Sequence, residues 1–230
     1  MRLRTLFLFI AALTLAAAPA QSAKDTKDKP VVIKGQSCEQ NMACSWTALN
    51  VSRTAEATAS SVLENKKDYA AKNAIDADPS SGDGYFFGNP ATAWCEGKSD
   101  TDKGEYIRIT FKEPVQISAL LVSAGYDKNP DIFSKNSRIK KATLVLSDRT
   151  RYELRFGEHF IDMNNGKSSY QPLKTKSTIT NSPQLFMLVP EGAKPRKVSW
   201  IMLVIDEAVP GWKYKDTCIS TIDIIPKAGD

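Results

Sequence analysis

The sequence is 230 residues long, with 31 lysines and arginines against 26 aspartates and glutamates, which gives a net charge of +5. This excess is small and spread along the chain, so it gives little support for a nucleic-acid-binding surface. The length allows one β-sandwich domain or two small domains, and no internal repeat is visible.

The first 23 residues have the organisation of a secretory signal peptide. Two arginines form a basic start, an apolar run occupies residues 6–18, and small residues end the segment. The run is shorter than the roughly 20 apolar residues that span a bilayer, and no later segment is long and apolar enough. We therefore expect cleavage after Ala20 or Ala23, no membrane span, and a secreted or periplasmic protein with a net charge of +3.

Four cysteines follow the predicted signal peptide: Cys38, Cys44, Cys95 and Cys218. In an exported chain this number indicates two disulfides, with reduced cysteines in the core as the alternative. Zinc binding is disfavoured, because the spacings form no CxxC pairs and His159 is the only histidine. Residues 24–44 are expected to be a polar leader, disordered up to residue 36, in which CEQNMAC could close a local loop.

From residue 45 onward the sequence alternates between short apolar strands and turn signals. In residues 105–111, Ile107, Ile109 and Phe111 share one face, and Pro114 is expected to end this strand. About eight strands separated by turns predict an all-β fold, an antiparallel sandwich with at most one short helix, near residues 65–73. Other strands are expected at residues 115–126, 139–148, 151–156, 185–189, 200–206 and in the last apolar stretch.

Three stretches of the sequence resemble a known family. They are NAIDADPSSGDGYFFGNPATAW (73–94), GYDKNPDIFSKNSRIKKATL (125–144) and PGWKYKDTCISTIDII (210–225). In this order they resemble discoidin domains, also called F5/8 type C or galactose-binding-like domains, and are closest to the NAD glycohydrolase translocation branch. The resemblance implies a jelly-roll β-sandwich over residues 45–226, a short tail at 227–230, and a function in binding.

In the discoidin family, the loop of the first stretch often surrounds a calcium ion. The resemblance places Asp76 and Asp78 in this loop, and Thr221 at a position of the last strand where the family often has glutamate. Loop carboxylates and carbonyls are the oxygen ligands that Ca²⁺ prefers. The alternative is that Asp76 holds a turn by accepting backbone hydrogen bonds, which the long inserted segment and Thr221 favour. No other cofactor is expected.

Five aromatic residues fall in the loop segments of these stretches: Tyr85, Phe86 and Phe87 in the first, Trp212 and Tyr214 in the last. Exposed together, their rings would form a platform for the C–H face of a sugar, while polar neighbours bind its hydroxyl groups. The alternative is that these rings cover the end of the sandwich.

Lys128 and Arg138 are expected to be among those polar neighbours, although stabilising a turn is the alternative for Arg138. No serine elbow, metalloprotease motif or phosphate-binding loop accompanies the lone His159, so no enzymatic activity is expected. The resemblance therefore implies a non-catalytic module that binds a glycan. A protein–protein interaction or adhesion module of the same fold is the alternative.

The resemblance also implies a disulfide pairing. In the family, the loop that ends in Trp94 lies beside the last strand, so Cys95 and Cys218 are expected to be bonded. This pairing leaves Cys38 and Cys44 to close a local loop. The rival pairing, Cys38–Cys218 with Cys44–Cys95, stays open at this point.

Overall fold

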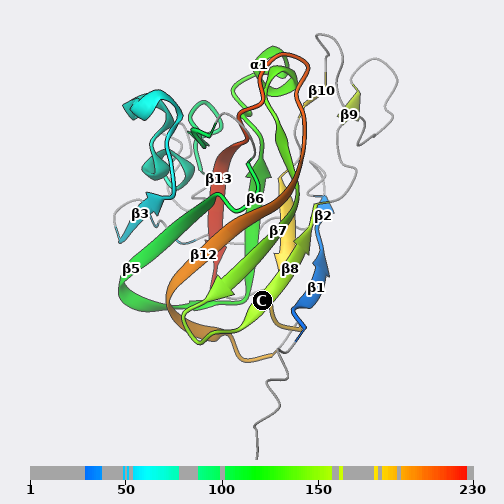
Figure 1. Cartoon of the computed structure of the whole chain (residues 1–230). Coiled ribbons are helices and arrows are strands. Elements are labelled where there is room, and N and C mark those ends of the chain that lie inside the picture. Colours follow the sequence, from blue (N-terminus) through cyan, green and yellow to red (C-terminus); the bar gives the residue numbers. More distant parts are fainter. Residues whose placement is uncertain are drawn as a thin grey trace, which may run out of the picture.

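A computed structural model describes residues 29–37, 49, 51, 54–77, 88–98, 102–156, 161–162, 179–180, 183–190 and 193–226 (Figure 1). The helices are η1 (Leu63–Asn65), η2 (Lys67–Tyr69) and η3 (Ala71–Ala74), all of the 3-10 type, and the α-helix α1 (Pro130–Lys135). The strands are β1 (Val31–Lys34), β2 (Gln36–Ser37), β3 (Ala55–Ala59), β4 (Trp94–Cys95), β5 (Tyr106–Ile117), β6 (Ala119–Ala124), β7 (Arg138–Leu146), β8 (Arg151–Arg155), β9 (Ile161–Asp162), β10 (Ile179–Thr180), β11 (Gln184–Met187), β12 (Arg196–Val209) and β13 (Cys218–Ile225).

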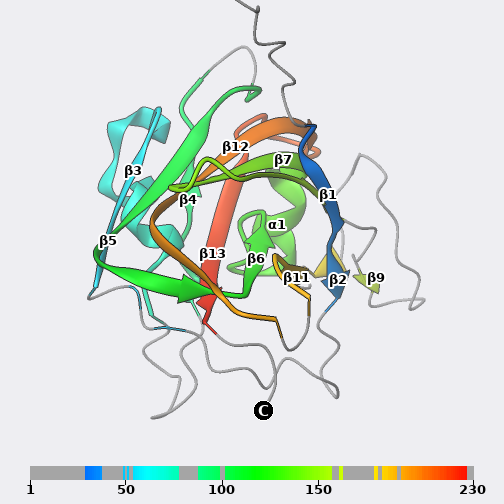
Figure 2. The ribbon, with the colours of Figure 1, turned by 90° about the horizontal axis from the view of Figure 1, so that it is seen from below.

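Two sheets form the sandwich. One has six strands in the order β1-β8-β7-β12-β5-β3, and the other has five in the order β2-β11-β6-β13-β4, while β9 and β10 form a separate pair. Nearly all neighbouring strands are antiparallel, the exception being the parallel pair β1–β8. Viewed from below, β1 and β2 connect one edge of the sandwich to the other sheet across Gly35 (Figure 2). The prediction of an all-β antiparallel sandwich is confirmed.

The core lies between the two sheets and follows the alternation seen in the sequence. Ile107, Ile109 and Phe111 of β5 are all buried, as their shared face predicted, and they belong to one cluster with residues of both sheets. Trp94 is fully buried, and its indole N–H donates to the carbonyl oxygen of Ser61 at 2.9 Å. The same residue therefore fills the core and ties β4 to the segment before η1.

The predicted leader is partly wrong. Residues 31–34 and 36–37 form β1 and β2, and β1 pairs in register with β8, Val31 opposite Tyr152 and Ile33 opposite Leu154. The run Val-Val-Ile consists of β-branched residues, which fit a pleated sheet surface well. The structure therefore has thirteen strands among its described residues, more than the eight expected, with four of them only two residues long.

The predicted helix and one strand end are also corrected. Residues 63–74 form three short 3-10 helices, whereas the α-helix lies at Pro130–Lys135, between the strands predicted at 115–126 and 139–148. Its start has a local signal, because the Asn129 side chain accepts a hydrogen bond from the Ile132 N–H at 2.9 Å and Pro130 occupies the first turn. Pro114 does not end β5, which continues to Ile117 across a shift in its register with β12.

Several predicted features lie outside the described residues and stay predictions: the signal peptide at 1–23, Cys38, Cys44, Asp78, Tyr85, Phe86, Phe87, His159 and the tail at 227–230. Among the described helices, none is long and apolar enough to cross a membrane.

Candidate functional site

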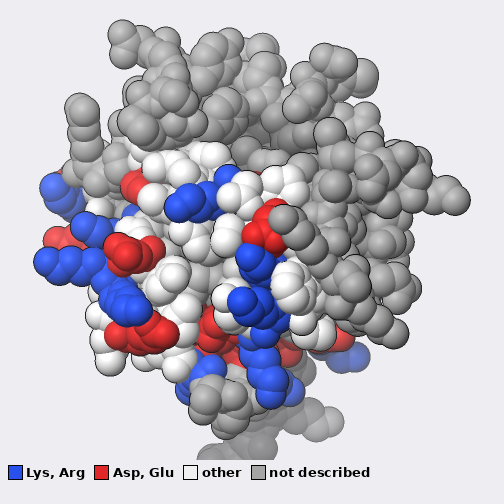
Figure 3. All heavy atoms as spheres, turned by 90° about the horizontal axis from the view of Figure 1, so that it is seen from above, with Lys and Arg blue, Asp and Glu red and all other residues white. Residues whose placement is uncertain are grey.

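The described parts of the three stretches singled out in the sequence meet toward one end of the sandwich, the end that carries α1 in Figure 1. We call it the upper end and define it by residues 60–77, 88–98, 102–105, 125–138 and 209–218. Isolated bridges join Gly125 to Ile219 and Ser137 to Thr217, so segments distant in sequence are adjacent here. Seen from above, the described surface of this end carries basic and acidic side chains intermixed with uncharged ones (Figure 3).

Helix α1 fixes the segment from Gly211 to Tyr214. Its last carbonyl groups would lack partners within so short a helix, and they accept hydrogen bonds from this segment. The N–H of Trp212 donates to Ser134 O at 3.1 Å, and the N–H of Tyr214 donates to Lys135 O at 2.8 Å. A Cβ on Gly211 would lie 2.5 Å from the carbonyl carbon of Asn136, so only glycine fits at this turn.

The two described aromatic residues of the predicted platform are presented differently. Tyr214 is 40% exposed, and the Lys213 ammonium lies 5.0 Å from the centre of its ring. Trp212 is half-buried, and its indole N–H donates to Ser134 Oγ at 3.2 Å. Lys128 is exposed in the turn before α1. The structure thus brings two of the predicted aromatic residues and one predicted cation to the same end.

The structure corrects the prediction for Arg138. The sequence offered it as a ligand-binding residue, but it is fully buried, with its guanidinium 5.4 Å from the centre of the Phe133 ring. Gly125 packs over the same ring, because a Cβ there would lie 2.6 Å from a Phe133 carbon atom. Arg138 therefore supports α1 from below and does not reach a ligand at the surface. Asn136 has a similar structural role, since its amide donates to Ile132 O at 2.9 Å.

Cys95 and Cys218 form a disulfide, the pairing that the resemblance implied. They occupy directly opposed positions of β4 and β13, with their Cα atoms 4.1 Å apart, and Trp94 lies opposite Ile219. The bond joins residues 123 positions apart in the sequence. It ties the loop that follows Asp76 to the last strand.

The loop beginning at Asp76 is closed by hydrogen bonds. Both carboxylate oxygens of Asp76 lie within reach of the Thr92 hydroxyl, at 2.9 and 3.0 Å, and the Asp76 carbonyl accepts from the Asn89 N–H at 3.1 Å. Partial burial raises the pKa of Asp76, against the hydrogen bond from Thr92. Asn73 supports the same loop, donating to the carbonyl groups of Asp68 at 2.7 Å and Ala93 at 3.3 Å.

Sequence reasoning missed a buried carboxylate beneath this loop. Asp223 of β13 is 6% exposed and accepts a hydrogen bond from the Gly88 N–H at 2.9 Å. Burial raises its pKa to about 7, against the hydrogen bonds from Gly88 and Thr221. The available signal was an aspartate inside the apolar run Ile-Asp-Ile-Ile, where a charged residue needs a reason to be buried.

The described residues around Asp76 bear on the predicted calcium site. Within the described ranges, no group of three or more acidic, histidine or cysteine side chains is arranged to hold a metal ion. Thr221 is buried, and a Cβ on Gly88 would lie 2.5 Å from the Thr221 Cβ, so its side chain packs against the loop backbone. Because Asp78 lies outside the described residues, the calcium site stays a prediction.

Two further buried carboxylates stabilise the upper end by accepting hydrogen bonds from neighbouring segments. Glu96 accepts hydrogen bonds from the N–H groups of Lys98 at 2.7 Å and Thr217 at 3.2 Å, and burial raises its pKa. Glu105 accepts from Ser60 Oγ at 2.6 Å, from Ser61 Oγ, and from the Lys98 ammonium at 2.8 Å. Burial acts to raise the pKa of Glu105, but these hydrogen bonds outweigh it and lower the pKa. Both carboxylates are committed to structural partners.

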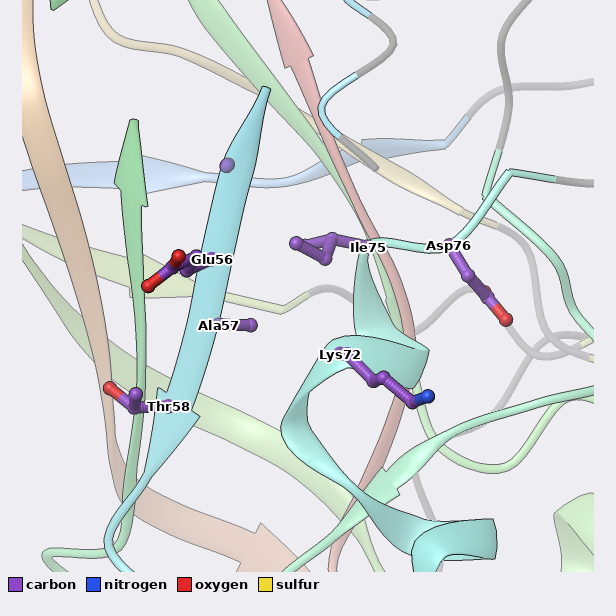
Figure 4. Close-up of a pocket in the computed structure, with 7 residues that line it drawn as sticks. Glu56, Ala57, Thr58, Lys72, Ile75 and Asp76 are labelled. Atoms are coloured by element: carbon purple, nitrogen blue, oxygen red, sulfur yellow. The ribbon is translucent and has the colours of Figure 1, made fainter. Parts of the chain in front are cut away.

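A hollow of about 450 Å³ lies between β3 and η3, beside Asp76 (Figure 4). In Figure 4, Ala57 and Ile75 point toward one another across it, whereas Glu56 and Thr58 point to the other side of β3. Asp76 points away from β3. The side chains that face the hollow are therefore apolar and small, and they offer few groups that could orient a polar ligand.

Comparisons with known proteins agree with this architecture. The pattern of the family described as NAD glycohydrolase translocation F5/8 type C domain matches residues 46–225. Curated protein sequences gave no match. Among solved structures, the CBM32-1 and CBM32-2 domains of Clostridium perfringens ZmpB align with a TM-score of 0.52 and 13% identity, over 84% of this chain and 41% of that chain. This similarity concerns the fold.

Two other solved structures are similar at a lower score. The family 32 CBM of C. perfringens NanJ, in complex with galactose, aligns with a TM-score of 0.47 and 14% identity, over 77% of this chain and 97% of that chain. The domain CpGH89CBM32-5 of Clostridium perfringens, in complex with GalNAc-β-1,3-galactose, aligns with a TM-score of 0.47 and 16% identity, over 78% and 99% of the two chains.

Proposed function

Because this chain belongs to the NAD glycohydrolase translocation family of F5/8 type C domains, we propose that it is an exported, non-catalytic module that binds a glycan through the loops of its upper end. The observation that carries the proposal is the segment Trp212–Tyr214, which α1 holds in place and which leaves the Tyr214 ring accessible. A loop backbone held in place before binding loses little conformational entropy when a sugar packs on its ring.

The surroundings of this segment suit a polar ligand. Lys213 is exposed beside the Tyr214 ring and Lys128 is exposed in the turn before α1, and both can donate hydrogen bonds to sugar hydroxyl groups. The carboxylates nearby, Glu96 and Glu105, are already engaged with backbone or side-chain donors, so they are poorly placed to serve as a catalytic pair. This favours binding over hydrolysis, which needs two carboxyl groups about 5 to 10 Å apart on either side of the substrate.

A protein interface is the rival function, and the described surface gives it less support. A broad interface would be expected to have a contiguous apolar patch. The large hydrophobic residues that are exposed in the described chain are Val31, Val32, Tyr106 and Tyr214, which belong to three separate segments. Single exposed rings beside donors fit a sugar site better than a protein-binding face.

A glycan-array screen with the protein lacking its predicted signal peptide tests the proposal. Binding to at least one glycan is expected, with a loss of about tenfold on Tyr214→Ala, since removal of a stacked ring removes its packing energy. Ser134→Ala separates the two roles of Trp212, because it deletes the hydrogen bond to the indole but leaves the ring. Tyr106→Ala, which removes an exposed tyrosine on β5, is the matched control.

The expected pattern is reduced affinity for Tyr214→Ala and Trp212→Ala and unchanged affinity for Tyr106→Ala. If all three variants bound the glycan as tightly as the unchanged protein, Trp212 and Tyr214 would not be part of the binding site. Turnover of a glycoside or of NAD by the purified protein, abolished by a single substitution, would overturn the non-catalytic part.

A further inference from the structure

A second hollow, of about 930 Å³, lies at the opposite end of the sandwich. It is lined by the hairpin between β7 and β8, by Trp200 of β12 and by residues at the start of β1. Strand β7 begins beside α1 and runs for nine residues before this hairpin, so the hollow is remote from Trp212 and Tyr214 (Figure 1). We call it the hairpin hollow.

The hairpin that forms one wall is held in a fixed shape. Asp148 Oδ1 accepts the N–H of Thr150 at 2.9 Å, and Leu146 N donates to Thr150 O at 2.9 Å. Arg196 also stabilises the turn, because its Nη1 donates to Asp148 Oδ2 at 2.9 Å and to Thr150 Oγ1 at 3.2 Å. The one acidic residue that lines the hollow is therefore already paired with a cation from β12.

Three other cations line the hairpin hollow: Lys29, Arg149 and Arg151. All three are exposed, and within the described part of the chain none of their side chains forms an ion pair or a hydrogen bond. With Asp148 neutralised by Arg196, the rim carries an excess of positive charge. Fixed cations around a recess attract an anion and raise its local concentration.

Arg149 occupies a backbone position that disfavours it. Its φ of +69° lies in the left-handed region, where glycine or asparagine is the usual residue of a hairpin turn. Strained backbone positions are concentrated at functional sites, where the side chain has a use that offsets the strain. The position puts an arginine at the tip of the hairpin, on the wall of the hollow.

The rest of the lining is aromatic and apolar. Trp200 is half-buried on the outer face of the six-stranded sheet, with the Arg108 guanidinium 4.4 Å from its ring centre. Val145 and Val31 line the hollow with it, and Val31 is among the most exposed hydrophobic residues described. Such a lining can pack against the C–H groups of a ligand while the surrounding arginines bind its charges.

We propose that the hairpin hollow binds an acidic saccharide, one that carries sulfate or carboxylate groups. Guanidinium groups bind these anions with two parallel hydrogen bonds, and the Trp200 ring with its valine neighbours offers an apolar surface for sugar rings. The volume suits a ligand of a few sugar rings, whereas an extended acidic peptide would have to run past it. This site is separate from the upper end and does not depend on glycan binding there.

The test measures binding of a heparin-derived tetrasaccharide to the protein lacking its predicted signal peptide, by calorimetry at low ionic strength. Arg149→Gly and Arg151→Ala together should weaken binding by about tenfold or more, because two charge-assisted contacts are lost. Arg149→Gly keeps the fold, since glycine adopts the left-handed backbone without strain. Trp200→Phe should weaken binding less than loss of the arginines.

The control pair is Lys67→Ala with Lys72→Ala, which removes two exposed positive charges from η2 and η3 and leaves the hollow intact. This variant should bind the tetrasaccharide within about twofold of the unchanged protein, apart from a small loss of long-range attraction. Equal weakening by both double variants would mean that only net charge matters, and the site would be rejected.

Three further binding measurements identify the chemical class of the ligand and the site that binds it. The desulfated, N-acetylated tetrasaccharide should bind much more weakly than the sulfated one through this hollow, and equal binding overturns the role of the arginines. Polyglutamate of matched charge should bind more weakly than the tetrasaccharide; tighter binding would assign the hollow to an acidic protein segment instead. Tyr214→Ala should leave tetrasaccharide binding unchanged. This variant therefore distinguishes a wrong proposal for the hairpin hollow from a wrong proposal for the glycan site at the upper end.

Discussion

The two ends of the sandwich are held together in different ways. At the upper end, segments far apart in the sequence are joined by the Cys95–Cys218 bond, by hydrogen bonds between α1 and residues 212–214, and by buried carboxylates such as Glu96 and Glu105. At the opposite, lower end, the β7–β8 hairpin is shaped by hydrogen bonds among residues 146–150 and by one partly exposed ion pair, between Arg196 and Asp148. Long-range links should therefore make the upper end sensitive to substitution, while the lower end tolerates it.

Removing the long disulfide should have the largest effect on stability. For the double variant Cys95→Ala/Cys218→Ala we expect a loss of about 4 to 5 kcal/mol in the free energy of unfolding, because the unfolded chain regains the entropy of a loop of more than a hundred residues. Replacing both cysteines avoids mispairing with Cys38 and Cys44. Urea unfolding followed by tryptophan fluorescence measures the change, and a loss below about 1 kcal/mol would show that the upper end does not depend on this bond.

The buried carboxylate Asp223 should make stability depend on pH. Its pKa is about 7 in the folded protein, well above the usual value near 3.8 in the unfolded chain. Between these two values the folded protein keeps a proton that the unfolded chain releases, so stability should fall as pH rises from about 4 to about 7 and then level off.

Asp223→Asn should remove this slope. The amide oxygen can still accept the Gly88 N–H, and the cost of a buried charge disappears, so the variant should be more stable at pH 8 by about 4 kcal/mol at most. Unfolding measured at pH 5 and pH 8 checks it. If the variant and the unchanged protein keep the same slope, the carboxylate is not the titrating group.

Gly211→Ala tests how tightly the segment from Gly211 to Tyr214 is fixed to α1. The added Cβ would overlap the backbone of Lys135 and Asn136, so we expect a loss of about 2 kcal/mol and weaker glycan binding. Lys215→Ala, an exposed change four residues on, should leave stability within about 0.5 kcal/mol and is the matched control. Unchanged stability in Gly211→Ala would mean that the turn can move away from α1.

The smallest effect is expected at the lower end. Arg149→Gly relieves a left-handed backbone position but adds freedom to the unfolded chain, so the two contributions should nearly cancel, with a net change below about 1 kcal/mol. Thermal unfolding of this variant beside Gly211→Ala gives the direct comparison of the two ends. A loss as large as that of Gly211→Ala would contradict the distinction drawn between them.

Local patterns were sufficient for most of the longer strands and for part of the upper end. Alternation in β5 identified Ile107, Ile109 and Phe111 as core residues, and the family stretches indicated the neighbourhood of Trp94, Cys95 and Cys218. The aromatic pair Trp212 and Tyr214 was also identified, although the sequence could not say that one would be half-buried. These features depend on residue type and spacing along the chain, which the sequence states directly.

Other features depend on partners far away in the sequence. Arg138 looks like a surface cation in a loop, but folding places Phe133 and Gly125 around it and buries it. Residues 31–34 become a strand because β8 offers them an edge, and the hairpin hollow exists because β12 brings Trp200 and Arg196 beside residues 148–151.

The sequence by itself determined which residues are apolar, and which family stretches and cysteines the chain carries. Only the tertiary structure decided which charged groups are buried, as Asp223 and Arg138 show. The physical reason is that the energy of a charge depends on the solvent and the partners around it, and both are set by segments that meet only when the sheets pack.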